Sequence, residues 1–137
     1  MRRVPGPRPV RYSQSLPKVA ASAASARRVI DGLSGSLDPT VLSNARLLVS
    51  ELVANAVEHV PEDGRIRLDV ALTNGVLRVA VTDPGHGFTP RPRRPEAPKN
   101  SGWGLHFVSL LADRWAVAAD GAGQVWFELD ASAARAS

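Results

Sequence analysis

Residues 65–87 read RIRLDVALTNGVLRVAVTDPGHG and carry two strand patterns on either side of a turn dipeptide. Apolar side chains occupy every second position from Ile66 to Leu72, which is the period of a half-buried strand. Asn74-Gly75 follows, and this dipeptide is a strong signal for a two-residue hairpin turn. Residues 76–82 predict the partner strand, so the stretch is expected to form a β-hairpin.

Two helices and a strand are expected before this hairpin. Asp38 suits a helix cap and Pro39 the first helical position, so a helix is predicted over 39–60. Residues 18–33 are rich in alanine, with apolar residues at helical spacing, and predict an earlier helix. Residues 10–16 alternate weakly and predict an edge strand.

The chain after the hairpin first loses all periodicity and then regains it. Residues 83–104 hold five prolines and four glycines, which is a long loop for a compact domain and therefore a candidate functional loop. A helix is predicted over 105–115, and strands over 115–119 and 124–129. This element order predicts an α+β two-layer sandwich, with helices covering one face of a mixed or antiparallel sheet.

Length and composition are those of one folded domain. The chain has 137 residues, 44% of them hydrophobic, and it contains no cysteine, which excludes disulfides and thiolate metal sites. We expect a basic, proline-rich and disordered arm over 1–9, the domain over 10–130 and a flexible tail over 131–137. Neither a membrane-spanning apolar run nor a signal-peptide core is visible, so a cytoplasmic protein is expected.

The formal net charge is +4, and basic residues gather before Asp31 and again over 91–99. A basic balance permits nucleic acid, an acidic protein or a polyphosphate as a partner, and it equally fits a solvated surface. Neither a reading helix nor a base-stacking platform is recognisable, so direct nucleic-acid binding is not expected.

The first candidate site motif lies on the long helix, where residues 51–55 read ELVAN. Glu51 and Asn55 are four residues apart and therefore project from the same face. The amide oxygen of Asn55 suits Mg²⁺, and Glu51 is placed to accept a proton from a hydroxyl or a water. Taken alone, such a pair most often marks a solvated helix face.

Two glycine-bearing motifs follow. Asp83 comes directly after a strand and precedes Gly85 and Gly87. Its carboxylate can accept a hydrogen bond from an exocyclic amine such as that of adenine, while the glycines let the backbone approach a flat ring. Residues 101–105 read SGWGL and open a helix, where exposed N–H groups and the helix dipole favour a phosphate.

The order and context of the three motifs resemble the GHKL superfamily of gyrase, heat-shock chaperone, mismatch-repair and histidine-kinase ATP sites. The resemblance implies a Bergerat-type ATP-binding fold that binds ATP with Mg²⁺. It implies that Asn55 is the metal ligand and Asp83 the adenine partner, with Gly85 and Gly87 as the wall beside adenine. It places the phosphates at Gly102, Trp103, Gly104 and Leu105, where Trp103 contacts the ligand or simply packs. Arg91, Arg93, Arg94 and Lys99 are open candidates for contact with the γ-phosphate.

A narrower resemblance rests on residues 48–59, LVSELVANAVEH, and on residues 111–115, LADRW. Both look like the bacterial anti-sigma-factor serine kinases, a family of regulators of transcription. The resemblance covers about 10–129 and implies an antagonist protein and a sigma factor as partners, together with a homodimer. It makes Glu51 the base for the serine hydroxyl of the antagonist. The alternative is a catalytically silent ATP-binding module that only captures a partner.

Overall fold

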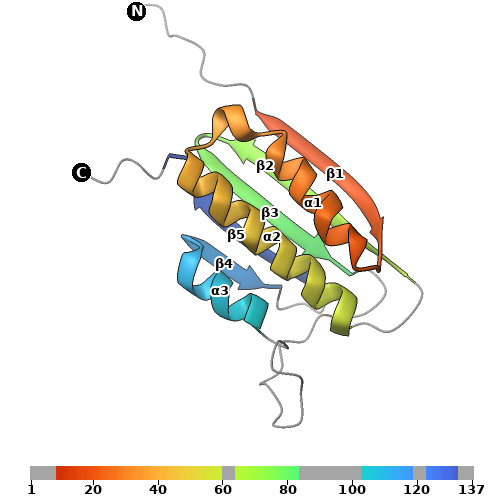
Figure 1. The fold of residues 1–137 in the computed structure, drawn as a ribbon. Coiled ribbons are helices and arrows are strands. Elements are labelled where there is room, and N and C mark those ends of the chain that lie inside the picture. Colours follow the sequence, from red (N-terminus) through yellow and green to blue (C-terminus); the bar gives the residue numbers. More distant parts are fainter. Residues whose placement is uncertain (1–8, 60–63, 84–102, 119–122, 133–137) are drawn as a thin grey trace, which may run out of the picture.

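The computed structural model describes residues 9–59, 64–83, 103–118 and 123–132, and it shows two layers (Figure 1). Five strands form one sheet in the order β1-β2-β3-β5-β4, and all four pairings are antiparallel. The helices cover one face of this sheet. The predicted α+β sandwich is confirmed, with a fully antiparallel sheet. The elements are β1 Val10–Pro17, α1 Ala21–Asp31, the short 3₁₀ helix Ser34–Ser36, α2 Pro39–His59, β2 Arg65–Thr73, β3 Val76–Thr82, α3 Trp103–Leu111, β4 Arg114–Val117 and β5 Gln124–Asp130.

The predicted hairpin is β2–β3, and its turn has the expected geometry. Asn74 and Gly75 have φ values of 51° and 76°, so both lie in the left-handed region that the tight hairpin turn requires. The register pairs Thr73 with Val76, directly across the turn. The turn thereby fixes which side chains of both strands face the helices.

The long helix α2 begins as predicted. The backbone N–H of Thr40 donates to Oδ1 of Asp38 at 2.9 Å, which caps the helix before Pro39. Leu48, Val49 and Val53 lie on its buried side, against the sheet. The core between the layers is completed by fully buried apolar side chains from the other elements: Ile30, Ile66, Leu68, Val70, Leu77, Val79, Val108, Val125 and Phe127.

The start of the first helix differs from the prediction. Strand β1 continues to Pro17, which pairs with Arg65, and α1 begins only at Ala21. The hydroxyl of the buried Ser22 donates to the carbonyl of Pro17 at 2.6 Å and so fixes the turn between them. Lys18 therefore lies in this turn and not in a helix, because pairing with β2 overrides the local helical spacing.

The C-terminal elements also have shifted bounds. Helix α3 spans Trp103–Leu111 instead of 105–115, and β4 spans Arg114–Val117 instead of 115–119. Between them, the Asp113 carboxylate accepts the backbone N–H of Asp130 at 2.8 Å. This contact ties the turn to β5, so the chain leaves the helix earlier than its apolar spacing indicates.

None of the helices within the described ranges is long and apolar enough to cross a membrane.

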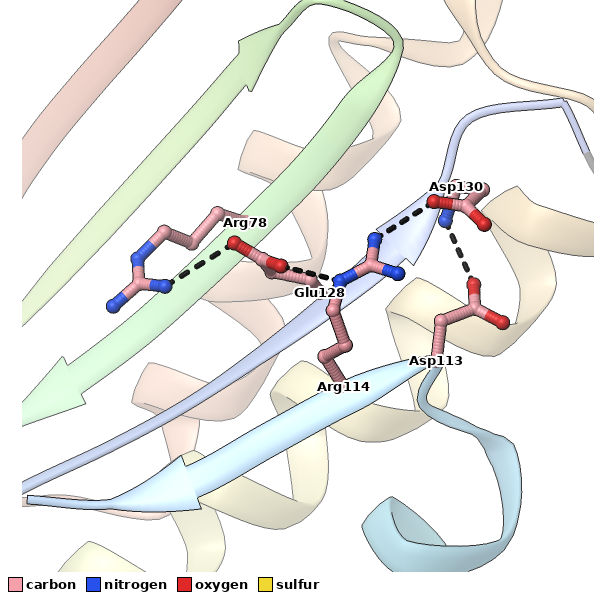
Figure 2. A network of polar contacts seen from close by, with 5 residues as sticks. All are labelled: Arg78, Asp113, Arg114, Glu128 and Asp130. Carbon is pink, nitrogen blue, oxygen red and sulfur yellow. Dashed lines mark hydrogen bonds and ion pairs between the residues drawn. The ribbon is translucent and has the colours of Figure 1, made fainter.

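A polar network on the sheet face away from the helices links β3, β5 and β4 (Figure 2). Glu128 accepts from Arg114 at 2.7 Å and from Arg78 at 3.2 Å, and Arg114 also donates to Asp130 at 2.8 Å. The hydrogen bond from Arg114 lowers the pKa of Glu128 below its ordinary value of 4.5; Arg78 adds to this effect and partial burial opposes it. Asp130 and then Glu128 raise the pKa of the Arg114 guanidinium.

The lowered pKa of Glu128 predicts how the free energy of unfolding changes at acidic pH. Because the folded state lowers the pKa of Glu128, its charge stabilises the fold above the ordinary pKa of 4.5, and this contribution is lost as the pH falls through the lowered value. Urea unfolding should show wild type more stable than Glu128→Gln at pH 7, by about 0.5–1 kcal/mol for a half-exposed pair. The difference should shrink on acidification, and a difference that grows as the pH falls would contradict the assignment.

Candidate functional site

A buried carboxylate stands at the end of β3, at the boundary between the two layers. Asp83 follows Thr82, and its side chain is 2% exposed. Its backbone N–H donates to the carbonyl of Gly123 at 2.8 Å, which joins the end of β3 to the approach to β5. A charged side chain in such a place is costly unless it is compensated, so its position calls for a specific partner or ligand.

A small apolar cavity lies beside this carboxylate. Leu52 and Ala56 of α2, Val81 of β3, and Gly123 and Val125 at β5 line it, together with Asp83. Its volume is about 10 Å³, which is room for about one water molecule. The described residues therefore form an apolar floor around a space that is much smaller than a purine ring.

The helix that supplies this floor also carries the two polar residues singled out in the sequence. Asn55 lies between Leu52 and Ala56 and is 4% exposed, whereas Glu51 is only partly buried. The sequence alone favoured a solvated pair of polar residues on this helix. The Asn55 amide is instead buried in an otherwise apolar helix face. The structure thus brings Asp83 and the α2 turn of Asn55 to the same cavity, from two distant parts of the sequence.

Asn55 also fits the metal that the resemblance implies. Mg²⁺ prefers hard oxygen ligands and is usually held by one or two protein groups together with phosphates and waters. Among the residues that the structure describes, no group of three or more histidine, aspartate and glutamate side chains gathers as an all-protein metal cage. A single amide oxygen at Asn55 is the kind of donor that a shared Mg²⁺–phosphate site uses.

A cation lies against Asp83, and it was not predicted from the sequence. The Nζ atom of Lys18 is 2.9 Å from Oδ2 of Asp83, and the Lys18 side chain is 4% exposed. Both charges are therefore removed from water and compensate each other. Leu16 of β1 faces the core, and Lys18 is two positions further on. Strand alternation therefore indicates that the Lys18 side chain also points inward, but this follows only when the predicted strand is extended past residue 16.

Part of the predicted site lies outside the described residues. This holds for Gly85, Gly87 and Gly102, and for the four basic candidates Arg91, Arg93, Arg94 and Lys99. Of the predicted phosphate residues, Trp103, Gly104 and Leu105 form the first turn of α3. The first backbone N–H groups of a helix lack intrahelical acceptors, so this turn has the donors that a phosphate requires.

Comparison with known proteins now decides the family. The family model described as "Histidine kinase-like ATPase domain" matches residues 16–128. The chain belongs to this family of histidine kinase-like ATPase domains. The matched range contains all three sequence motifs and extends from the end of β1 into β5. The GHKL resemblance predicted from the sequence is confirmed.

Individual relatives narrow the comparison. Two proteins called anti-sigma F factor, from Clostridium botulinum strains Eklund 17B and Alaska E43, are each 30% identical over 103 residues. Each alignment covers 66% of this chain and 71% of the relative. A crystal structure of the RsbU and RsbW domains of Rv1364c from Mycobacterium tuberculosis superposes with a TM-score of 0.60 at 26% identity. It covers 93% of this chain, which spans 32% of that longer protein.

Proposed function

We propose that this protein binds ATP with Mg²⁺ and acts as an anti-sigma factor with protein serine kinase activity. The observation that carries the proposal is the buried Asp83 carboxylate beside an apolar cavity whose floor is the α2 turn of Asn55. The family of ATPase domains and the anti-sigma F factors among the relatives support it. Membership of a fold family does not by itself fix a function, so the residues have to carry the chemistry.

In this proposal, the nucleobase end of the site lies at the floor of the cavity. Asp83 accepts a hydrogen bond from the exocyclic amine of adenine, and the walls at Leu52, Val81 and Val125 pack against the ring. The proposal also assigns Gly85 and Gly87 to this end, as the wall beside adenine that the family resemblance implies. Because the carboxylate offers only acceptors, it selects bases that present a donor at the corresponding position.

The other end of the site handles the phosphates. Asn55 would hold Mg²⁺, and the chemistry that the ion would supply is neutralisation of charge on the phosphate oxygens. The N–H groups at the start of α3, together with Gly102 and Gly104, receive the phosphates. Glu51 lies one helical turn from Asn55, which places a base next to the phosphate end.

These positions give a phosphoryl transfer with defined roles. Glu51 accepts the proton of a serine hydroxyl on the antagonist protein as that oxygen bonds to the γ-phosphorus. The bond from the γ-phosphorus to the bridging oxygen breaks, and ADP leaves with the electron pair. The modified antagonist and the sigma factor are the two protein partners in this proposal.

Transfer of labelled phosphate tests the proposal directly. The protein is incubated with ATP labelled at the γ-position, Mg²⁺ and its cognate antagonist, and label is expected on an antagonist serine. The same sample is assayed for capture of the sigma factor. Nucleotide binding and capture without any transfer would instead identify a silent partner-capture module and reject the kinase.

A further inference from the structure

Lys18 reaches Asp83 by crossing the end of strand β2. Pro17 pairs with Arg65 and Arg67 pairs with Thr82, so Lys18, Gly64 and Asp83 follow one another across the ends of three adjacent strands. Figure 1 shows these ends of β1 and β3 close to the last turns of α2. The backbone N–H of Lys18 also donates to the Gly64 carbonyl at 3.3 Å, which holds the two chains together at this point.

Gly64 makes the crossing possible. A Cβ atom added there would lie 3.1 Å from Nζ, 3.3 Å from Cε and 3.6 Å from Cδ of Lys18. The lysine side chain therefore occupies the space that a side chain at residue 64 would otherwise fill. A Cβ added at Gly35, by contrast, meets nothing within 4 Å, so Gly35 offers an open position for comparison.

The ammonium of Lys18 contacts Asp83 without lining the cavity. The cavity is lined from α2, β3 and β5, and Lys18 is not among its lining residues. Lys18 lies in the turn after β1, and its side chain passes Gly64 directly before the start of β2. The Asp83 carboxylate thus contacts a buried cation and also lines the apolar cavity.

We propose that Lys18 is a positioning residue for nucleobase recognition, acting through Asp83. The proposal rests on the ATP site described above. Lys18 compensates the charge of the carboxylate and fixes its orientation, so that a full acceptor is presented to the exocyclic amine of adenine. A base with a carbonyl at that position places its own acceptor against the acceptor of Asp83 and is therefore rejected.

This role predicts an effect that depends on one group of the ligand. The probes are ATP and purine riboside 5′-triphosphate, which lacks the exocyclic amine, each titrated with Mg²⁺ by calorimetry. Hydrogen bonds to charged groups are worth about 1.5–3 kcal/mol, so Lys18→Met should weaken ATP binding about 10- to 100-fold. Binding of purine riboside triphosphate should change less than about twofold, because no amine contact is lost. Lys18→Arg, which keeps a cation beside Asp83, should retain most of the discrimination.

A second variant keeps the test valid if Lys18→Met folds poorly. Gly64→Val keeps both charges but fills the space under the lysine side chain, and should reduce the preference for ATP in the same direction. Gly35→Val and Arg46→Met are the matched controls, since Arg46 belongs to an exposed ion pair with Asp31. Circular dichroism verifies that each variant is folded at the temperature of the titration.

The outcomes separate this inference from the ATP site itself. Wild type that prefers ATP, with a preference lost in Lys18→Met and Gly64→Val, supports the positioning role. Equal weakening of both nucleotides, or unchanged preference, overturns it and leaves Lys18 as a structural ion pair while the ATP site stands. Wild type that binds neither nucleotide rejects the ATP site and the positioning role together.

Discussion

Glu51→Gln is expected to abolish phosphate transfer to the antagonist while leaving ATP binding intact. General base catalysis by a positioned side chain contributes about 10²- to 10⁴-fold, so the transfer rate should fall by this factor. The substitution keeps the size and shape of the side chain but removes its charge and its basicity. Glu51 is only partly buried and does not line the cavity, so the ATP dissociation constant should change by less than about threefold.

Single-turnover transfer of labelled phosphate measures this prediction, with calorimetry on the same samples for ATP affinity. Glu128→Gln is the matched control, because Glu128 lies on β5 in the network with Arg78 and Arg114. The control should transfer phosphate at the wild-type rate. A Glu51→Gln protein that transfers at the wild-type rate would exclude Glu51 as the base.

Lys18→Met is expected to lower the free energy of unfolding by about 3–5 kcal/mol, because it leaves the Asp83 carboxylate buried without its cation. Asp83→Asn should lower the free energy of unfolding by a similar amount, because it leaves the Lys18 ammonium uncompensated. The double variant should lose clearly less free energy of unfolding than the sum of the losses in the two single variants, because it removes both charges together. Lys18 and Asp83 side chains are 4% and 2% exposed, so solvent screens little of this effect.

Urea unfolding followed by circular dichroism measures the four proteins of this cycle. Arg46→Met provides the reference for an exposed pair: the Arg46 and Asp31 side chains are 46% and 43% exposed. This reference should change stability by no more than about 1 kcal/mol. Strictly additive effects of Lys18→Met and Asp83→Asn would show that the two charges do not act as a buried pair.

Local chemistry explains why some elements were predictable from the sequence. The β2–β3 hairpin follows from an alternating pattern and a dipeptide that accepts positive φ at both positions. The start of α2 follows from Asp38, whose carboxylate meets a backbone N–H only two residues away. In both cases the residues that fix the structure are neighbours in the chain.

The turn at Lys18 was not predictable in this way. Its alanine-rich surroundings have helical spacing, but the backbone pairs with β2 and the side chain with Asp83, both distant in the sequence. The same holds for Gly64, which appears as an ordinary turn residue until its position under Lys18 is known. Long-range pairing decided these positions against local propensity.

The candidate site was predictable in its parts but not in its assembly. The motifs at residues 51–55 and at Asp83 indicated a nucleotide site only in combination. In the structure, Asp83 and Leu52 of the first motif line one cavity, whereas Glu51 and Asn55 do not line it. The burial of Asn55 does not follow from its sequence context, since such a residue is usually exposed. The roles of Glu51, Asn55 and Asp83 stay predictions that binding and transfer measurements test.

Calorimetric titration with ATP, with and without Mg²⁺, tests whether the chain binds a nucleotide through Asn55 and Asp83. Wild type should bind in the micromolar range with Mg²⁺, Asn55→Ala should lose the dependence on Mg²⁺, and Asp83→Asn should bind about 100-fold more weakly. Asp69→Asn is the matched control, because Asp69 pairs with the exposed Arg67 at 3.0 Å. It should bind ATP like wild type. Wild type that binds no nucleotide, or Asp83→Asn that binds as tightly as wild type, would contradict the account.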